Sequence, residues 1–119
     1  MSRLAAYTEN KIATQTGGKI VVMLYEGAIR FLKRAVAQIE AQDWEGKNVS
    51  IQKAQAVIDE LRAALNKQAG GDVADNLWKL YDFMYRRLVE ANIRKDIARI
   101  GEVIAIMEDL LQGWRGISD

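Results

Sequence analysis

The residues that most often perform chemistry in proteins are either missing from this sequence or spread apart. The chain contains no histidine and no cysteine, which excludes the commonest general base and metal ligand, and any disulfide or thiolate zinc site. Acid–base catalysis needs two carboxylates held in one cleft, whereas the carboxylates here fall on predicted solvent faces. They include Glu26, Glu60, Asp82, Glu102 and Glu108. We therefore predict no catalytic residues, no metal site, no cofactor and no enzymatic activity.

Two stretches could be taken for binding sites for phosphate or nucleic acid. Gly17-Gly18 precedes Lys19, but the spacing of a phosphate-binding loop and a preceding strand are both absent. Residues 86–99 hold five basic side chains against two acidic ones. A nucleic-acid surface needs more positive charge and nearby stacking aromatics. We interpret this stretch as a solvated face or a docking point for an acidic partner, and predict no nucleic-acid partner.

Length and composition indicate a single helical domain. At 119 residues with a 50% hydrophobic composition, the chain can bury a core, and it has no proline to interrupt helices. The net charge of +1 argues against binding to nucleic acid or a membrane surface. The first ten residues lack the apolar segment of a signal peptide, and the longest uncharged apolar run has six residues. A bilayer span needs about 20, so we predict a cytoplasmic protein without membrane insertion.

Hydrophobic periodicity predicts an all-α protein, an antiparallel up-down four-helix bundle with an N-terminal arm. Apolar residues recur at spacings of three and four over four segments, and short connections between amphipathic helices make neighbours antiparallel. Residues 1–18 hold few large apolar side chains and are expected to form the arm. The bundle is expected over residues 19–119, with helices at about 19–41, 47–67, 73–91 and 97–114.

Turn residues set the expected boundaries. Gly70 and Gly71 are expected to end the second helix, and Asp72 to cap the third. Asp96 is the expected N-cap of the fourth.

The sequence offers more apolar surface than a simple bundle needs. In residues 19–39 the apolar side chains cover an arc of roughly 200°, whereas about 100° is enough to place a helix on a core. Phe83 is expected on the wet face of its helix, where it either marks a contact surface or is an ordinary exposed residue. The arm is either a plug for a binding groove or a frayed terminus.

A short pattern occurs twice, 56 residues apart. Each copy places an acid four residues before an arginine, and a tyrosine on the core side of its helix, where the hydroxyl needs a partner. Chance and duplication of a helical hairpin both explain the repeat. The first copy is Leu24, Tyr25, Glu26, Arg30 and Leu32, and the second is Leu80, Tyr81, Asp82, Arg86 and Leu88.

The chain resembles the flagellar secretion chaperones of the FliS type from Tyr7 to Trp114. The family usually has a Ser-Pro pair before the first long helix, where this chain has Gly17-Gly18, so the arm is expected to be joined more loosely here. The similar motifs are M-L-Y-E-G-A-I-x-F-L at 23–32, N-x-x-I-x-K-A at 48–54, I-x-x-L at 58–61, G-G-D-V-A-x-N-L-W-x-L-Y-D-F-M at 70–84 and R-R-L-x-x-A-N at 86–92.

The resemblance implies a chaperone of the bacterial cytosol that binds the disordered C-terminal segment of flagellin. It would prevent premature polymerisation and assist flagellar type III export, with the export apparatus as a further partner. Apart from the resemblance, we also consider a homodimer, which the surplus of apolar surface could support. The arm, including Tyr7, would cover part of the client surface. The alternative is a helical adaptor or dimerisation protein without a flagellin client. Our partner-binding candidates are Tyr7, Ile20, Val22, Leu24, Tyr25, Ile29, Leu77, Tyr81, Phe83 and Met84.

Overall fold

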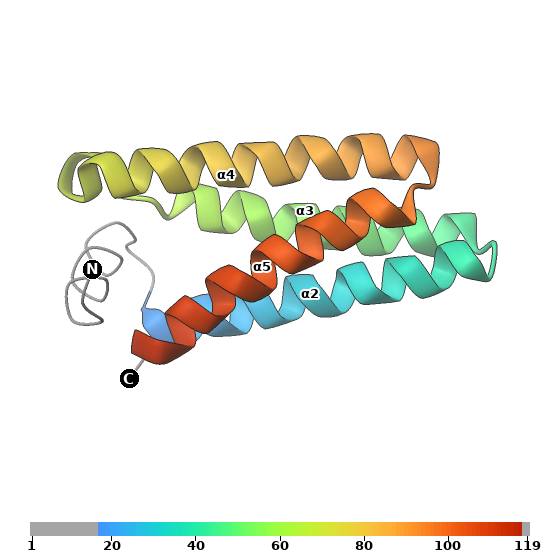
Figure 1. Cartoon of the computed structure of the whole chain (residues 1–119), viewed down its shortest axis with the longest axis horizontal. Coiled ribbons are helices and arrows are strands. Elements are labelled where there is room, and N and C mark those ends of the chain that lie inside the picture. Colours follow the sequence, from blue (N-terminus) through green and yellow to red (C-terminus); the bar gives the residue numbers. More distant parts are fainter. Residues whose placement is uncertain (1–16, 118–119) are drawn as a thin grey trace.

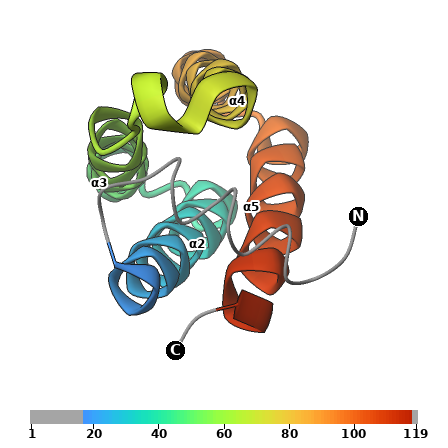
Figure 2. The ribbon, with the colours of Figure 1, turned by 90° about the vertical axis from the view of Figure 1, so that its left-hand side faces the viewer.

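Four helices form an elongated bundle in the computed structural model, which describes residues 17–117. Each helix runs antiparallel to the one before it (Figure 1). Helices α2 and α4 both contact α3 and α5, so the four helices occupy the corners of a square in chain order (Figure 2). The predicted all-α four-helix bundle is confirmed, whereas residues 1–16 of the predicted arm lie outside the described residues. The helices are α2 (Gly18–Glu40), α3 (Trp44–Ala63), α4 (Lys67–Arg94) and α5 (Ile97–Ile117).

Helix α3 begins at Trp44, earlier than the expected residue 47, because its N-cap lies in the preceding turn. The carboxylate of Asp43 accepts a hydrogen bond from the backbone N–H of Gly46 at 3.0 Å. A Cβ atom at Gly46 would overlap the side chains of Asp43 and Gln38, so glycine leaves the room that this arrangement of the cap uses. The helix ends at Ala63 rather than near residue 67.

Helix α4 is longer at both ends than the expected 73–91. Asn66 caps it by accepting a hydrogen bond from the N–H of Ala69 at 3.1 Å, so Asn66 takes the capping role expected of Asp72. The helix is interrupted at Gly71, where φ is 51° and ψ is −128°; this backbone conformation favours glycine. Gly71 therefore introduces a kink within α4, and the glycine pair does not end the preceding helix.

Two polar connections join the helices near the turn between α4 and α5. Lys47 of α3 is buried, and its Nζ donates to the backbone carbonyl and the side-chain oxygen of Asn92 at 2.8 and 2.7 Å. Burial, and then the charge of Lys95, lower the pKa of Lys47. On the other side of α4, Arg87 pairs with Glu102 of α5 at 2.8 Å.

The turn itself is fixed by Asp96, which accepts a hydrogen bond from the N–H of Arg99 at 3.2 Å and confirms the predicted N-cap. Backbone and side-chain hydrogen bonds from Arg99 lower the pKa of the Asp96 carboxyl, against the opposing effect of burial.

All four helices contribute to one hydrophobic core. No helix between residues 17 and 117 has the length and the apolar character needed to cross a bilayer. Each large core side chain contributes about 1.5–3 kcal/mol relative to an exposed one. The largest fully buried side chains are Tyr25, Tyr81, Leu32, Ile51, Ile58, Met84, Leu88, Ile100 and Met107.

Candidate partner-binding groove

The tilt of α5 opens a groove along one side of the bundle. This helix starts beside the end of α4 and finishes beside the start of α2 (Figure 1), where Arg115 pairs with Glu26 at 2.7 Å. Its C-terminal half is therefore separated from the first half of α4. The space between them is a groove with a volume of about 310 Å³, which we call the α4/α5 groove.

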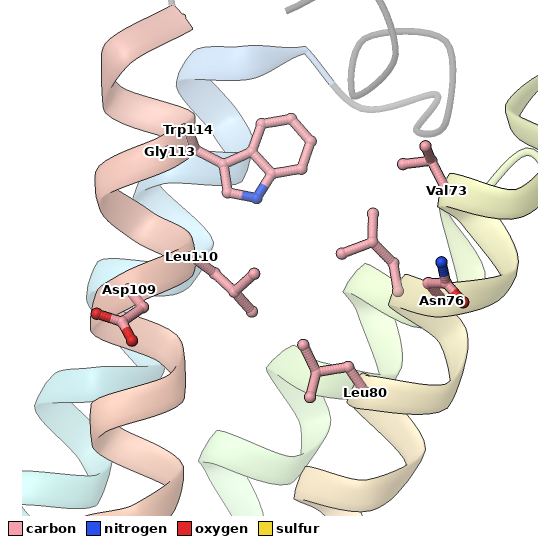
Figure 3. A pocket seen from close by; sticks show the side chains of 8 residues that line it. Val73, Asn76, Leu80, Asp109, Leu110, Gly113 and Trp114 are labelled. Atoms are coloured by element: carbon pink, nitrogen blue, oxygen red, sulfur yellow. The ribbon is translucent and has the colours of Figure 1, made fainter. Parts of the chain in front are cut away.

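The α4/α5 groove has an apolar floor and a polar rim. The labelled side chains of Leu80, Leu110 and Trp114 project from the two helices into the space between them (Figure 3). Leu77, Leu80 and Leu110 are only partly buried, so their exposed surface is available to a ligand. Asn76 and Asp109 also line the groove, together with Val73 and Gly113.

The chemistry of this groove suits apolar recognition rather than catalysis. Its volume is at the lower end of the range for ligand pockets, about 300–1,000 Å³, and its floor has no cluster of titratable groups. A partly exposed apolar strip between two helices can accept the apolar face of a third helix. The groove can therefore bind side chains that recur at helical spacing.

The sequence-based candidates are divided between this groove and other places. Among those that the structure describes, Leu77 alone lines the α4/α5 groove. Ile20 is 56% exposed on α2. Phe83 is 44% exposed on α4, as expected for a residue on the solvent-facing side of its helix, and the Arg87 guanidinium lies 5.3 Å from the centre of the Phe83 ring. Tyr7 lies outside the described residues. The others are core residues (Tyr25, Ile29, Tyr81 and Met84) or partly buried against the core (Val22 and Leu24).

Four apolar residues that line the groove were absent from the candidate set, namely Val73, Leu80, Leu110 and Trp114. The sequence contained a signal for one of them, because Leu110 is followed by Leu111, and adjacent apolar residues widen a helical stripe beyond one contact line. Leu111 is buried in the core, while Leu110 lies beside it and faces the groove.

A second depression, between α3 and α4, has a different character. Its volume is larger, about 490 Å³, but four of its six lining residues are charged. Arg62 and Asp82 pair across it at 3.2 Å, so an apolar ligand would have to desolvate this pair. The α4/α5 groove is therefore the better site for an apolar segment.

Tyr25 and Tyr81, the tyrosines of the repeated pattern, meet at the centre of the bundle. Their hydroxyl oxygens are 2.7 Å apart, and both residues are at most 1% exposed. Each hydroxyl thus has the partner that its buried position requires, and the partner is the equivalent tyrosine of the other copy. The ring of Tyr25 also lies 6.4 Å from that of Trp114, centre to centre. The pair therefore supports the wall of the α4/α5 groove from inside.

The same pair predicts a loss of stability at alkaline pH. Burial raises the pKa of Tyr25 to about 12, although contacts with Tyr81 and Trp114 oppose the rise. Burial also raises the pKa of Tyr81, and the charge and hydrogen bond of Tyr25 add to the rise. The unfolded chain releases these protons near pH 10. The higher pKa values in the folded state therefore add to the unfolding free energy in full below pH 10, and this contribution is lost as the pH rises toward 12.

For Tyr25 alone this loss amounts to about 2–3 kcal/mol of unfolding free energy. Urea unfolding measured between pH 8 and 12 checks the prediction. The matched control is the Tyr25→Phe/Tyr81→Phe double variant, whose stability should fall less steeply above pH 10. Parallel curves for the two proteins would contradict the prediction.

Comparison with known proteins gives a consistent result over the chain. A family model described as flagellar protein FliS matches residues 1–119. The chain is 38% identical to the flagellar secretion chaperone FliS of Bacillus subtilis, over 92% of this chain and 81% of that protein. It is 36% identical to FliS of Salmonella typhimurium, over 92% and 82% of the two chains. For the flagellar secretion chaperone FliSB of Pseudomonas aeruginosa the identity is 34%, over 92% and 87%.

Proposed function

The chain belongs to the FliS family of flagellar secretion chaperones, and on that premise we propose that its client is the disordered C-terminal segment of flagellin. In this proposal it acts in the bacterial cytosol, prevents premature polymerisation of flagellin and assists its delivery to the type III export apparatus. Membership of a chaperone family implies a binding role rather than an enzymatic one. The observation on which the client assignment depends is the α4/α5 groove, with its apolar floor.

The physical basis of the proposal is the cost of ordering a disordered client. Such a segment loses conformational entropy when it binds, so its affinity must come from extensive apolar contact. A client helix with apolar residues three and four positions apart can place them against Leu77, Leu80 and Leu110. While those residues are held in the groove, they are unavailable to neighbouring flagellin subunits. Polymerisation is prevented because the chaperone occupies the same apolar face.

The remaining candidates have different roles in this proposal. Ile20 and Phe83 are exposed apolar contacts for a client chain that continues beyond the groove. Tyr7 belongs to an arm that covers part of the client surface until the client displaces it. The buried candidates Tyr25 and Tyr81 act indirectly, because their pair supports Trp114 at the groove wall.

A direct test mixes the purified chain with a peptide of the flagellin C-terminal segment. We expect a one-to-one complex in size-exclusion chromatography with light scattering. We also expect a negative heat-capacity change on binding and little dependence on salt, because the contact is mainly apolar. Flagellin polymerisation, followed by turbidity, should stop at an equimolar amount of the chain. A chain that forms dimers and ignores the peptide would instead support the adaptor alternative.

A further inference from the structure

We propose that Gly113 is the point where a client helix crosses α5 in direct contact with its backbone, and that Asp109 selects clients carrying a basic side chain beside their apolar face. This inference rests on the proposed function, and it names the residues that decide which segments fit the α4/α5 groove. Both residues line that groove from α5, one helical turn apart.

The folded bundle itself gives no reason for glycine at position 113. Glycine within a helix is less favourable than alanine, and Gly113 lies inside α5, four residues before its end. A Cβ atom placed there would meet no atom of residues 17–117 within 4 Å. Gly71 differs, because its φ of 51° favours glycine. The isolated bundle would therefore be more stable with alanine at position 113.

The location of Gly113 supplies the missing reason. It lies on the groove wall between Leu110 and Trp114 (Figure 3). A residue without a side chain lets another backbone approach closely, while the apolar residues on either side of it remain available to the approaching chain. A helix seated there can insert side chains toward Leu80 and Leu110 only if its backbone comes close to α5. Glycine permits that approach, and a methyl group would hinder it.

Asp109 indicates the polar character of the same client. It is exposed at the rim, is the only charged residue among the described residues that line the groove, and forms no ion pair among them. A carboxylate at the edge of an apolar groove favours a partner with a positive charge at the corresponding place, and disfavours one with a negative charge. The occupant is thus an amphipathic client helix with a lysine or arginine flanking its apolar face.

Two substitutions in one helix test the glycine. Gly113→Ala removes the close approach, and Gly101→Ala is its matched control. Gly101 also lies inside α5, is exposed and has no atom of the described residues within 4 Å of its Cβ position. Both variants should melt at a higher temperature than the natural chain. Titration with the flagellin C-terminal peptide should show affinity about tenfold weaker for Gly113→Ala, as expected when one methyl group is forced into a tight contact. The affinity of Gly101→Ala should be unchanged.

A structural role alone cannot produce higher stability together with weaker binding at only one of the two glycines. If Gly113→Ala binds the peptide as tightly as the unsubstituted chain, or if both variants bind it equally weakly, the proposed contact at Gly113 is wrong. Asp109→Asn should weaken binding about threefold at low salt and less at high salt, and an unchanged affinity would overturn the role of Asp109. If the natural chain does not bind the peptide, the proposed function fails and this inference fails with it. An unaffected Gly113→Ala variant of a binding chain overturns the inference alone.

Discussion

Replacing Leu110 with aspartate should weaken binding of the flagellin C-terminal segment by about 100-fold or more, and the bundle should remain folded. In the free protein this side chain is partly exposed in the α4/α5 groove, so a carboxylate there stays hydrated. In the complex the client would cover it, and a buried unpaired charge is strongly unfavourable. Isothermal titration with the peptide measures the affinity, and far-UV circular dichroism checks the fold.

Ile93→Asp is the matched control for this substitution. Ile93 is 76% exposed in the last turn of α4, at the opposite end of the bundle from the groove. The same apolar-to-acidic change there should leave peptide affinity within about twofold and stability within about 0.5 kcal/mol. If Ile93→Asp abolishes binding and Leu110→Asp does not, the client binds near the turn between α4 and α5 instead.

Removing one hydroxyl of the central tyrosine pair should destabilise the protein by about 1–3 kcal/mol, whereas removing both should cost much less. Tyr25→Phe leaves the Tyr81 hydroxyl buried without its partner at 2.7 Å, and Tyr81→Phe does the same to Tyr25. The double variant leaves neither hydroxyl unpaired. Urea unfolding of the four proteins gives the coupling energy directly.

Tyr85→Phe is the control for the pair, since Tyr85 is only partly buried and its hydroxyl has no hydrogen bond among the described residues. Its removal should change stability by less than about 0.5 kcal/mol. If the double variant loses the sum of the two single losses, the hydroxyls of Tyr25 and Tyr81 act independently. That result would mean that each has another hydrogen-bond partner in solution.

The arrangement of helices could be predicted from sequence because helical periodicity and short connections both depend on local spacing. The start of α3 was missed because a cap depends on a single side chain, Asp43, and on the space that Gly46 leaves for it. The kink in α4 was missed because a pair of glycines can end a helix or interrupt it, and their spacing does not distinguish the two outcomes.

The candidate site was less predictable, because it depends on how two helices lie relative to each other. Periodicity places Leu110 and Trp114 on or near the apolar side of α5, but it is the tilt of α5 away from α4 that makes both of them line a groove. For the same reason Tyr25 and Tyr81 could be expected to need partners, but their contact across the bundle could not be derived from either helix alone. Phe83 was the simpler case, since its exposure follows from its own helix.

The order of the helices around the bundle also affects how the chain folds. Of the four main contacts between the described helices, three join consecutive helices, and the fourth, between α2 and α5, connects distant parts of the chain. Such local topology favours rapid folding, and without proline there is no slow proline isomerisation to delay it. The contact between α2 and α5 closes the ring of four helices. The α4/α5 groove needs both helices in place, so a folding intermediate without a docked α5 would lack the proposed client site.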